Sequence, residues 1–203
     1  MVTKTKILTR GAEAIIYKKE NEVIKDRISK SYRIKELDNK IRKRRTKKEI
    51  KLLTKASKII NCPLPEKSKD SYKIKMPFIN GKKLSQYLDK FNLIKQKQIL
   101  KQIGEDVARL HQEDIIHGDL TTSNMILSKE KIFFIDFGLG YISRKIEDKA
   151  VDIHLLKQAL EAKHFKNWKI LFNEFLKGYS KNPEDKKIIE RLKAVEKRGR
   201  YKH

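Results

Sequence analysis

Cysteine is almost absent from this chain. A single residue, Cys62, occurs among 203, which excludes an intrachain disulfide framework and indicates a reducing compartment. Cys62 has no second thiol with which to form a metal site. We therefore interpret it as a structural thiol.

Long apolar runs are also missing. No apolar stretch near the N-terminus has the length of a signal peptide. The block IFFI, residues 132–135, is as long as a strand and too short to span a membrane. We therefore expect a soluble, cytoplasmic protein.

Acidic residues are few relative to basic ones. The chain has 26 Asp and Glu against 50 Lys and Arg, a formal net charge of +24. A positive potential of this size attracts polyanions such as nucleic acid. The alternative is a lysine-rich bias of the source lineage, for example a thermophile, in which the charge only keeps the protein soluble.

Strand patterns dominate the first part of the chain. Residues 6–27 are typical of three strands separated by turns. Residues 36–58 have the partial apolar face of a helix, and residues 71–76 alternate as a strand does. The segment PFING, residues 77–81, contains proline and glycine and is interpreted as a connector.

Helical patterns dominate after the connector. Apolar residues such as Ile99 and Ile103 recur at helical spacing, and the chain from about residue 147 is helical. The pattern predicts an α+β protein. Its sheet and one helix occupy residues 1–79 and its mainly helical part residues 80–203, with a ligand cleft between them.

Three polar side chains stand out in the stretch IIHGDLTTSNMILSKEKIFFIDFG, residues 115–138. Asp119, Asn124 and Asp136 lie at the ends of short apolar segments. A carboxylate can accept a proton from a hydroxyl or position a water, and an amide oxygen with a second carboxylate suits Mg²⁺. The alternative is a hairpin with solvated turn residues.

The pair HGDLTTSN and IDFG resembles the catalytic loop and the metal-binding DFG motif of protein kinases. This resemblance requires a lysine on an upstream strand that reaches the α and β phosphates of ATP, and Lys25 in VIKDR has that position. Glu49 is its expected acidic partner, since it shares a helix face with Leu53 and Ala56. The implied fold is a small two-lobed protein-kinase-like fold with an antiparallel sheet, helix C and a truncated helical C-lobe.

The resemblance also locates adenine at the connector. Met76 would be the gatekeeper, and the Pro77 carbonyl and Ile79 N–H would read the base, since proline lacks only a donor. The expected catalytic residues are Asp119 and Lys25, and the expected ligands of Mg²⁺, or of Mn²⁺ in its place, are Asn124 and Asp136. The expected ATP-binding residues are Leu8, Gly11, Ala12, Glu13, Ala14, Lys25, Glu49, Met76, Pro77 and Ile79.

The phosphate-facing loop RGAEAIIY departs from the kinase pattern. It has one glycine, Gly11, where protein kinases have G-x-G-x-x-G. Its backbone N–H groups can still face a phosphate, but we expect a less mobile loop. Glu13 is expected to repel a triphosphate unless it turns outward or meets a cation.

Three further departures concern the catalytic side. Gly118 stands where most protein kinases carry arginine, so the usual phosphate switch is not expected. Thr121 stands two residues after Asp119, where Ser/Thr kinases usually place a lysine, so one positive charge is missing near the transferred phosphate. Only 16 residues (152 − 136) separate Asp136 from Asp152, which leaves no room for a long activation loop or a peptide platform.

Some residues have expected supporting roles. Asp152 resembles the helix-borne aspartate that steadies a kinase catalytic loop by accepting backbone hydrogen bonds, and a surface position is the alternative. His117 is expected to pack beneath the loop and not to act as a base. Trp168, Phe172 and Phe175 recur at helical spacing and predict a core of the helical part.

Together with RGAEA, IKDR, EDKAVD and the terminal RGRY, these motifs resemble the small atypical kinase subunit of the KEOPS complex from Leu8 to Tyr201. The resemblance implies an atypical Ser/Thr protein kinase with ATPase activity and autophosphorylation. It implies support for threonylcarbamoylation of adenosine 37 in ANN-decoding tRNAs. The implied partners are the transferase subunit, which some archaea fuse into the same polypeptide, a small subunit on the N-lobe, and tRNA.

Two basic stretches fit this interpretation. RKRRTKK, residues 42–48, has six basic residues of seven. It either contacts tRNA phosphates or an acidic partner, or is a solvated helix face. The tail KRGRYKH, residues 197–203, is expected to reach the transferase or tRNA.

Other functions stay open from sequence. A free-standing RIO-like protein kinase shares the compact C-lobe. A small-molecule phosphotransferase of the aminoglycoside type shares the H-G-D…N pattern, but its usual larger helical insert is not visible here. The charge of +24 also suits a non-catalytic tRNA-binding scaffold.

Overall fold

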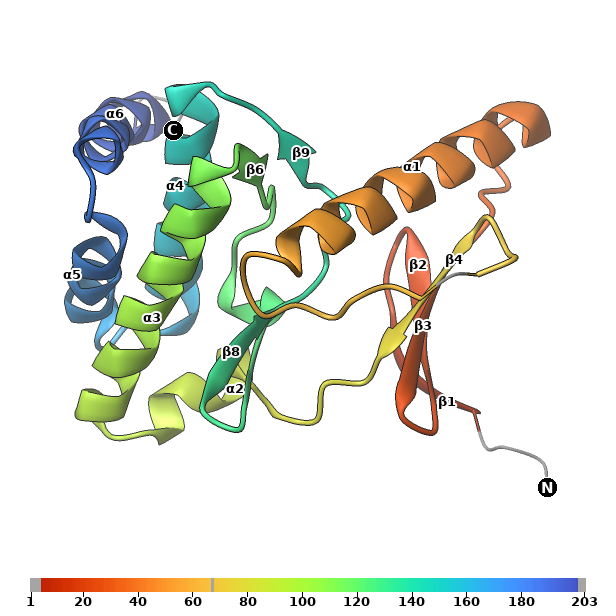
Figure 1. Ribbon diagram of the computed structural model, residues 1–203, viewed down its shortest axis with the longest axis horizontal. Coiled ribbons are helices and arrows are strands. Elements are labelled where there is room, and N and C mark those ends of the chain that lie inside the picture. The colour runs from red at the N-terminus through yellow and green to blue at the C-terminus, as the bar shows by residue number, and fades with distance from the viewer. Residues whose placement is uncertain (1–4, 67, 201–203) are drawn as a thin grey trace.

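Two parts of different architecture stand side by side in the computed structural model, which describes residues 5–66 and 68–200 (Figure 1). The first part is an antiparallel sheet with strand order β1-β2-β3-β4, crossed by a long helix, α1. These elements are β1 (Thr5–Arg10), β2 (Ala14–Lys19), β3 (Glu22–Arg27), α1 (Lys35–Ala56) and β4 (Lys73–Pro77).

The sheet register places Lys25 at the centre of the first part. Lys25 on β3 pairs with Ile16 on β2 and with Ile74 on β4. Helix α1 turns Glu49, Leu52 and other residues inward, and these are buried. The helix spans most of the residues predicted to be helical there.

The second part is mainly helical, as expected. Its helices are α2 (Leu84–Tyr87), the 3-10 turn η1 (Leu88–Lys90), α3 (Leu93–Gln112), α4 (Ile146–Lys163), α5 (Trp168–Tyr179) and α6 (Pro183–Arg200). Helices α3 and α5 touch backbone to backbone, because a Cβ at Gly104 would lie 2.1 Å from the Phe175 carbonyl oxygen. Pro183 begins α6, where its missing N–H costs no helical hydrogen bond.

Short strands carry the polar motif between the two parts. They are β5 (Lys82–Lys83), β6 (Ile115–Ile116), β7 (Met125–Ser128), β8 (Lys131–Phe134) and β9 (Tyr141–Ile142), with the 3-10 turn η2 (Thr122–Asn124) before β7. Strand β7 pairs with β5 and β8, and β6 pairs with β9. The motif is therefore not an isolated hairpin.

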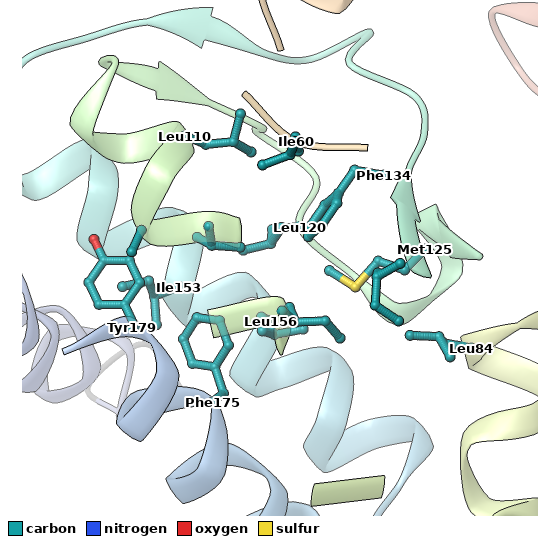
Figure 2. Packing of buried hydrophobic residues seen from close by; sticks show 14 of the residues in the cluster. Ile60, Leu84, Leu110, Leu120, Met125, Phe134, Ile153, Leu156, Phe175 and Tyr179 are labelled. Carbon is teal, nitrogen blue, oxygen red and sulfur yellow. The ribbon is translucent and has the colours of Figure 1, made fainter. Parts of the chain in front are cut away.

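One cluster of buried apolar side chains continues from α1 and β4 into the helical part. Figure 2 shows Leu120, Met125 and Phe134 of the motif in the same group of side chains as Ile153 and Leu156 of α4 and Phe175 and Tyr179 of α5. Phe172 and Phe175 are buried as predicted, whereas Trp168 is only partly buried. This continuous core holds the motif strands against both parts of the molecule.

Cys62 is a structural thiol, as interpreted from the sequence. It is buried, and its thiol lies 3.6 Å from the Leu53 carbonyl oxygen. Burial raises the pKa of this thiol to about 12, so it remains protonated and unreactive. In the part of the chain that the structure describes, no helix is both long and apolar enough to cross a membrane.

Candidate active site

A buried lysine stands between two carboxylates at the centre of the site. The Lys25 ammonium donates to Glu49 Oε1 and to Asp136 Oδ1, each at 2.7 Å. Strand β3 supplies the lysine, helix α1 supplies Glu49, and the segment after β8 supplies Asp136. The sequence predicted that Lys25 on a strand would pair with Glu49 on the following helix, and the two side chains do pair.

Asp136 is the most accessible member of this group. Its side chain is 46% exposed, against 1% for Glu49, and its φ of 62° lies in the left-handed region. Burial raises the pKa of the Asp136 carboxyl, but Lys25 and the Gly138 N–H together lower it by more, so the pKa lies below its ordinary value. The carboxylate is thus charged at neutral pH, and its strained backbone is typical of functional positions.

Asp119 and Asn124 are joined directly. The Asn124 side-chain amide donates to Asp119 Oδ2 at 2.8 Å and to the Asp119 carbonyl oxygen at 3.0 Å. Since the amide nitrogen makes both bonds, the Asn124 side-chain oxygen is left for another partner. The loop between Asp119 and η2 therefore presents one oriented carboxylate and one amide oxygen.

The backbone of this loop is held from below by Asp152 on α4. Its two carboxylate oxygens accept from the N–H of His117 at 2.8 Å and from that of Gly118 at 2.9 Å. His111 Nε2 also donates to Asp152 at 3.2 Å, and the other nitrogen of His111 meets the Tyr179 hydroxyl at 2.8 Å. The predicted role of Asp152 is confirmed, and its alternative surface position is wrong.

His117 joins the two halves of the motif. Its Nδ1 accepts from the Asp119 N–H at 3.3 Å, and its Nε2 donates to the Ile135 carbonyl oxygen at 3.1 Å. The ring is buried and packs on Phe137. His117 is thus structural, as predicted, and it ties the Asp119 loop to the residue before Asp136.

A third buried histidine, His164, supports η2. His164 Nε2 lies 3.0 Å from the Thr122 hydroxyl, and its Nδ1 lies 2.9 Å from Asp89. Thr122 and His164 are each 1% exposed. Asp152 on α4 and His164 directly after α4 therefore hold the loop, and His111 on α3 and Asp89 on η1 hold those two side chains in turn.

The missing arginine at position 118 has a steric cause. Gly118 has a φ of +78°, and a Cβ there would lie 2.6 Å from the Leu139 carbonyl oxygen. A side chain at this position requires the loop to move. The departure from the kinase pattern is therefore built into the path of the chain.

The segment after Asp136 is short and tightly held. Strand β9 pairs with β6, and the Ser143 N–H donates to the Asp114 carbonyl oxygen at 2.8 Å. Lys149 on α4 pairs with the Asp114 carboxylate at 2.8 Å. The chain thus passes directly into α4, as expected from the short spacing between Asp136 and Asp152.

Glu13 meets cations. Its carboxylate pairs with Arg45 on α1 and with Arg33, the latter at 3.5 Å. Burial raises the pKa of Glu13, but Arg45 and the neighbouring cations lower it by more, so the pKa lies below its ordinary value. Glu13 therefore meets a cation, which is one of the two conditions under which it is not expected to repel a triphosphate.

Two adjoining cavities bring the expected site residues together. The loop-side cavity, of about 310 Å³, and the connector-side cavity, of about 480 Å³, share Thr9, Ile16, Lys25 and Asp136. The expected residues lining the loop-side cavity are Gly11, Ala12, Glu13, Ala14, Lys25, Asp119 and Asp136. Those lining the connector-side cavity are Leu8, Lys25, Glu49, Met76, Pro77, Ile79, Asn124 and Asp136.

Sequence reasoning missed two cationic residues of the loop-side cavity, Arg27 and Arg45. Arg27 follows Lys25 by two positions on β3, so strand alternation places both on one face. Arg45 precedes Glu49 by four positions on α1, so both share a helix face. Helix periodicity, which selected Glu49, could therefore have selected Arg45, and strand alternation from Lys25 could have selected Arg27.

The protein-kinase-like class is defined by an antiparallel sheet with one helix, a helical second part and a Lys–Glu–Asp cluster of this kind. The chain has all three features, so the predicted fold class is confirmed. The RIO domain family matches residues 6–151. A solved structure described as WaaP in complex with acyl carrier protein has the same fold. It has a TM-score of 0.63 at 12% identity and covers 98% of this chain and 89% of that one.

Curated relatives match nearly the whole chain. The KEOPS complex subunit Bud32 of Pyrococcus abyssi is 40% identical, over 97% of this chain and 96% of that protein. The probable serine/threonine-protein kinase BUD32 homolog of Archaeoglobus fulgidus is 39% identical, over 94% of each. A probable bifunctional tRNA threonylcarbamoyladenosine biosynthesis protein of Methanobrevibacter smithii is 42% identical, but this chain spans only 37% of it.

The chain belongs to the RIO domain family and, by its relatives of matching length, to the Bud32 group of proteins. The resemblance stated from its motifs is thereby confirmed.

Proposed function

We propose that this chain is an atypical, ATP-dependent Ser/Thr kinase and ATPase. We further propose that it acts as a KEOPS subunit and supports threonylcarbamoylation of adenosine 37 in ANN-decoding tRNAs. The observation that carries the enzymatic part is the Lys25–Glu49–Asp136 cluster at the junction of two cavities that Asp119 and Asn124 also line. The names of the relatives support the part that concerns tRNA.

In this proposal the connector-side cavity holds the adenine and the loop-side cavity holds the phosphates. Met76 and Val23 offer apolar surface to a planar base, and the Pro77 carbonyl and Ile79 N–H read its edge. The Phe78 N–H donates to the Asn21 carbonyl oxygen at 2.7 Å, which fixes the start of the connector against the β2–β3 turn. Lys25 lines both cavities and so stands where base and phosphates meet.

A divalent cation, Mg²⁺ or Mn²⁺, would be held by Asp136 and Asn124. Both offer the oxygen donors that hard cations prefer. Among the described residues no cluster of three or more His, Cys, Asp or Glu is arranged to hold a metal, so the nucleotide phosphates would complete the ligand set. When bound, such an ion would neutralise phosphate charge.

Asp119 would orient the attacking water or hydroxyl. Its carboxylate is fixed by Asn124, and its backbone is fixed through His117. Orientation of this kind lowers the barrier because the nucleophile is held before the reaction starts. The short, tied segment from Gly138 to Lys145 offers little surface for a peptide, which favours hydrolysis or autophosphorylation.

The proposed partners follow from the relatives and the charge. The Methanobrevibacter relative combines a matching segment with additional chain in one bifunctional protein, which supports association with a transferase subunit. We propose that a small KEOPS subunit contacts the sheet-bearing part and that the basic surface contacts tRNA in the cytoplasm. The tail expected to assist begins at Lys197, and residues 201–203 lie outside the described part of the chain.

The test is ATP turnover by the purified protein, with and without the transferase subunit and tRNA. Asp119→Asn and Asp136→Ala should each reduce turnover by about 30- to 10³-fold, or roughly 2–4 kcal/mol in barrier. Glu161→Gln is the matched control, because Glu161 is exposed on α4 and lines neither cavity. Turnover unchanged in both site variants would refute the enzymatic role.

Two rival functions predict different outcomes in this experiment and in a parallel tRNA-binding assay. A free-standing RIO-like protein kinase predicts transfer to a protein in trans faster than hydrolysis. A tRNA-binding scaffold, favoured by the charge of +24, predicts tRNA affinity that is insensitive to Lys25→Met and Asp136→Ala, together with no turnover in the wild type.

A further inference from the structure

The loop-side cavity contains more positive charge than the usual kinase residues supply. Three of its lining residues are cationic: Lys25, Arg27 and Arg45. The catalytic loop itself has Thr121 where a lysine is usual. The cations of this cavity therefore come from the sheet and from α1.

Arg27 is held in a specific position. Its side chain is 4% exposed, and its Nη2 donates to Glu49 Oε2 at 2.6 Å. Glu49 thus accepts a hydrogen bond from Lys25 on one carboxylate oxygen and from Arg27 on the other. Because Glu49 is buried on α1, it orients both cations on the same face of β3.

Arg27 has an unpaired donor. Its Nε is buried and has no hydrogen-bond partner among the described residues, although a guanidinium has five N–H donors. Leaving a buried donor unpaired is costly, so such a group calls for an explanation. Lys25, by contrast, is already shared between two carboxylates.

The charges around the cavity balance only because Arg27 is present. Lys25 and Arg27 balance Glu49 and Asp136, and Arg45 is balanced by Glu13. Without Arg27, the carboxylates of Glu49, Asp119 and Asp136 would face Lys25 alone. A triphosphate brings further negative charge and would then meet a repulsive site.

We propose that Arg27 binds the terminal phosphate of the bound nucleoside triphosphate and supplies, from the sheet, the positive charge that Thr121 does not. This inference rests on the proposed nucleotide site. An arginine suits the role because its planar fork can hold Glu49 with one edge and a phosphate oxygen with another, which a lysine cannot do.

The test compares the affinities for ATP and ADP, each with Mg²⁺, by calorimetry. Arg27→Lys keeps a cation for Glu49 but removes the Nε–H, and Arg27→Gln removes the charge. Both should weaken ATP binding by about tenfold or more and ADP binding by less than about twofold, as expected for losing a charge-assisted bond to one phosphate. Lys75→Gln is the matched control, because it removes one charge from the neighbouring strand β4 at a residue that lines neither cavity.

A measurement on the wild-type protein makes the result independent of variant folding. The NMR signal of the Arg27 Nε–H should shift on adding a non-hydrolysable ATP analogue and stay in place with ADP. An unshifted signal, or an unchanged ATP-to-ADP affinity ratio in Arg27→Lys, overturns the role of Arg27 while leaving the nucleotide site intact. Failure of the wild type to bind either nucleotide would instead refute the proposed function and this inference with it.

Discussion

The two loops that face the loop-side cavity are built in opposite ways. The loop from His117 to Asn124, called the rigid loop below, is held by buried groups. Asp152 accepts hydrogen bonds from two of its backbone N–H groups, and His164 makes a hydrogen bond with Thr122. The loop around Glu13 is tied to α1 by the Glu13–Arg45 ion pair, whose side chains are about two-fifths exposed. Buried hydrogen bonds hold a geometry firmly, whereas exposed ion pairs are weak and screened by salt.

This difference suggests a division of labour. The rigid loop carries Asp119 and Asn124, which need fixed geometry for a reaction. The loop around Glu13, called the adjustable loop below, lines the same cavity, and the exposed ion pair that ties it to α1 costs little energy to break. A site with one fixed wall and one adjustable wall can admit a nucleotide without disturbing its reactive groups.

The largest expected effect on stability follows from removing the Asp152 carboxylate that holds the rigid loop. Asp152→Ala leaves the N–H groups of His117 and Gly118 and the His111 ring without their acceptor in a buried position. We expect a loss of about 3–5 kcal/mol in the free energy of unfolding, measured by chemical denaturation.

Asp152→Asn should lose most of the same free energy, because its NH₂ group would face donors. Glu13→Ala is the matched control on the adjustable loop and should cost less than about 1 kcal/mol. Equal losses in Asp152→Ala and Glu13→Ala would erase the distinction between the loops.

A methyl group added to each loop gives a second, smaller contrast. At Gly118 a Cβ would meet the Leu139 carbonyl oxygen at 2.6 Å with φ at +78°, whereas at Gly11 it would meet the Ala14 carbonyl oxygen at an ordinary 3.5 Å. Gly118→Ala should cost about 1–3 kcal/mol, and Gly11→Ala should change stability by less than about 0.5 kcal/mol. Thermal and denaturant unfolding of both variants measures this, and a tolerated Gly118→Ala would show that the rigid loop can move.

The smallest expected effect is a pH dependence on the adjustable loop. Because the pKa of Glu13 is lowered in the folded protein from 4.5, its ion pairs stabilise the fold above that value. The stabilisation is lost as pH falls through the lowered pKa. The difference in unfolding free energy between wild type and Glu13→Gln should therefore shrink from pH 7 to pH 3, and also in high salt. A difference that grows with acid would contradict the assigned pairing.

Much of the site followed from short-range patterns. Lys25 was selected by its strand and Glu49 by its helix face, and the two side chains do meet. Asp119, Asn124 and Asp136 were selected by motif, and they line the same pair of cavities. Such patterns succeed because strand and helix periods determine which face of an element a side chain occupies.

The support beneath the rigid loop was mostly beyond sequence reasoning. His111, Asp152 and Tyr179 form one hydrogen-bonded chain, although they come from α3, α4 and α5. Only Asp152 was selected, and that by resemblance. No local period links residues so far apart, because their contacts depend on how three helices pack.

The sequence by itself determined the order of strands and helices, the family and the chemical types at the site, because these depend on local periodicity and on contiguous motifs. Only the tertiary structure decided that Arg27 joins Lys25 on Glu49, that Arg45 neutralises Glu13, and that Gly118 has no room for a side chain. Each of these depends on distances between elements separated along the chain, and packing of the whole core sets such distances.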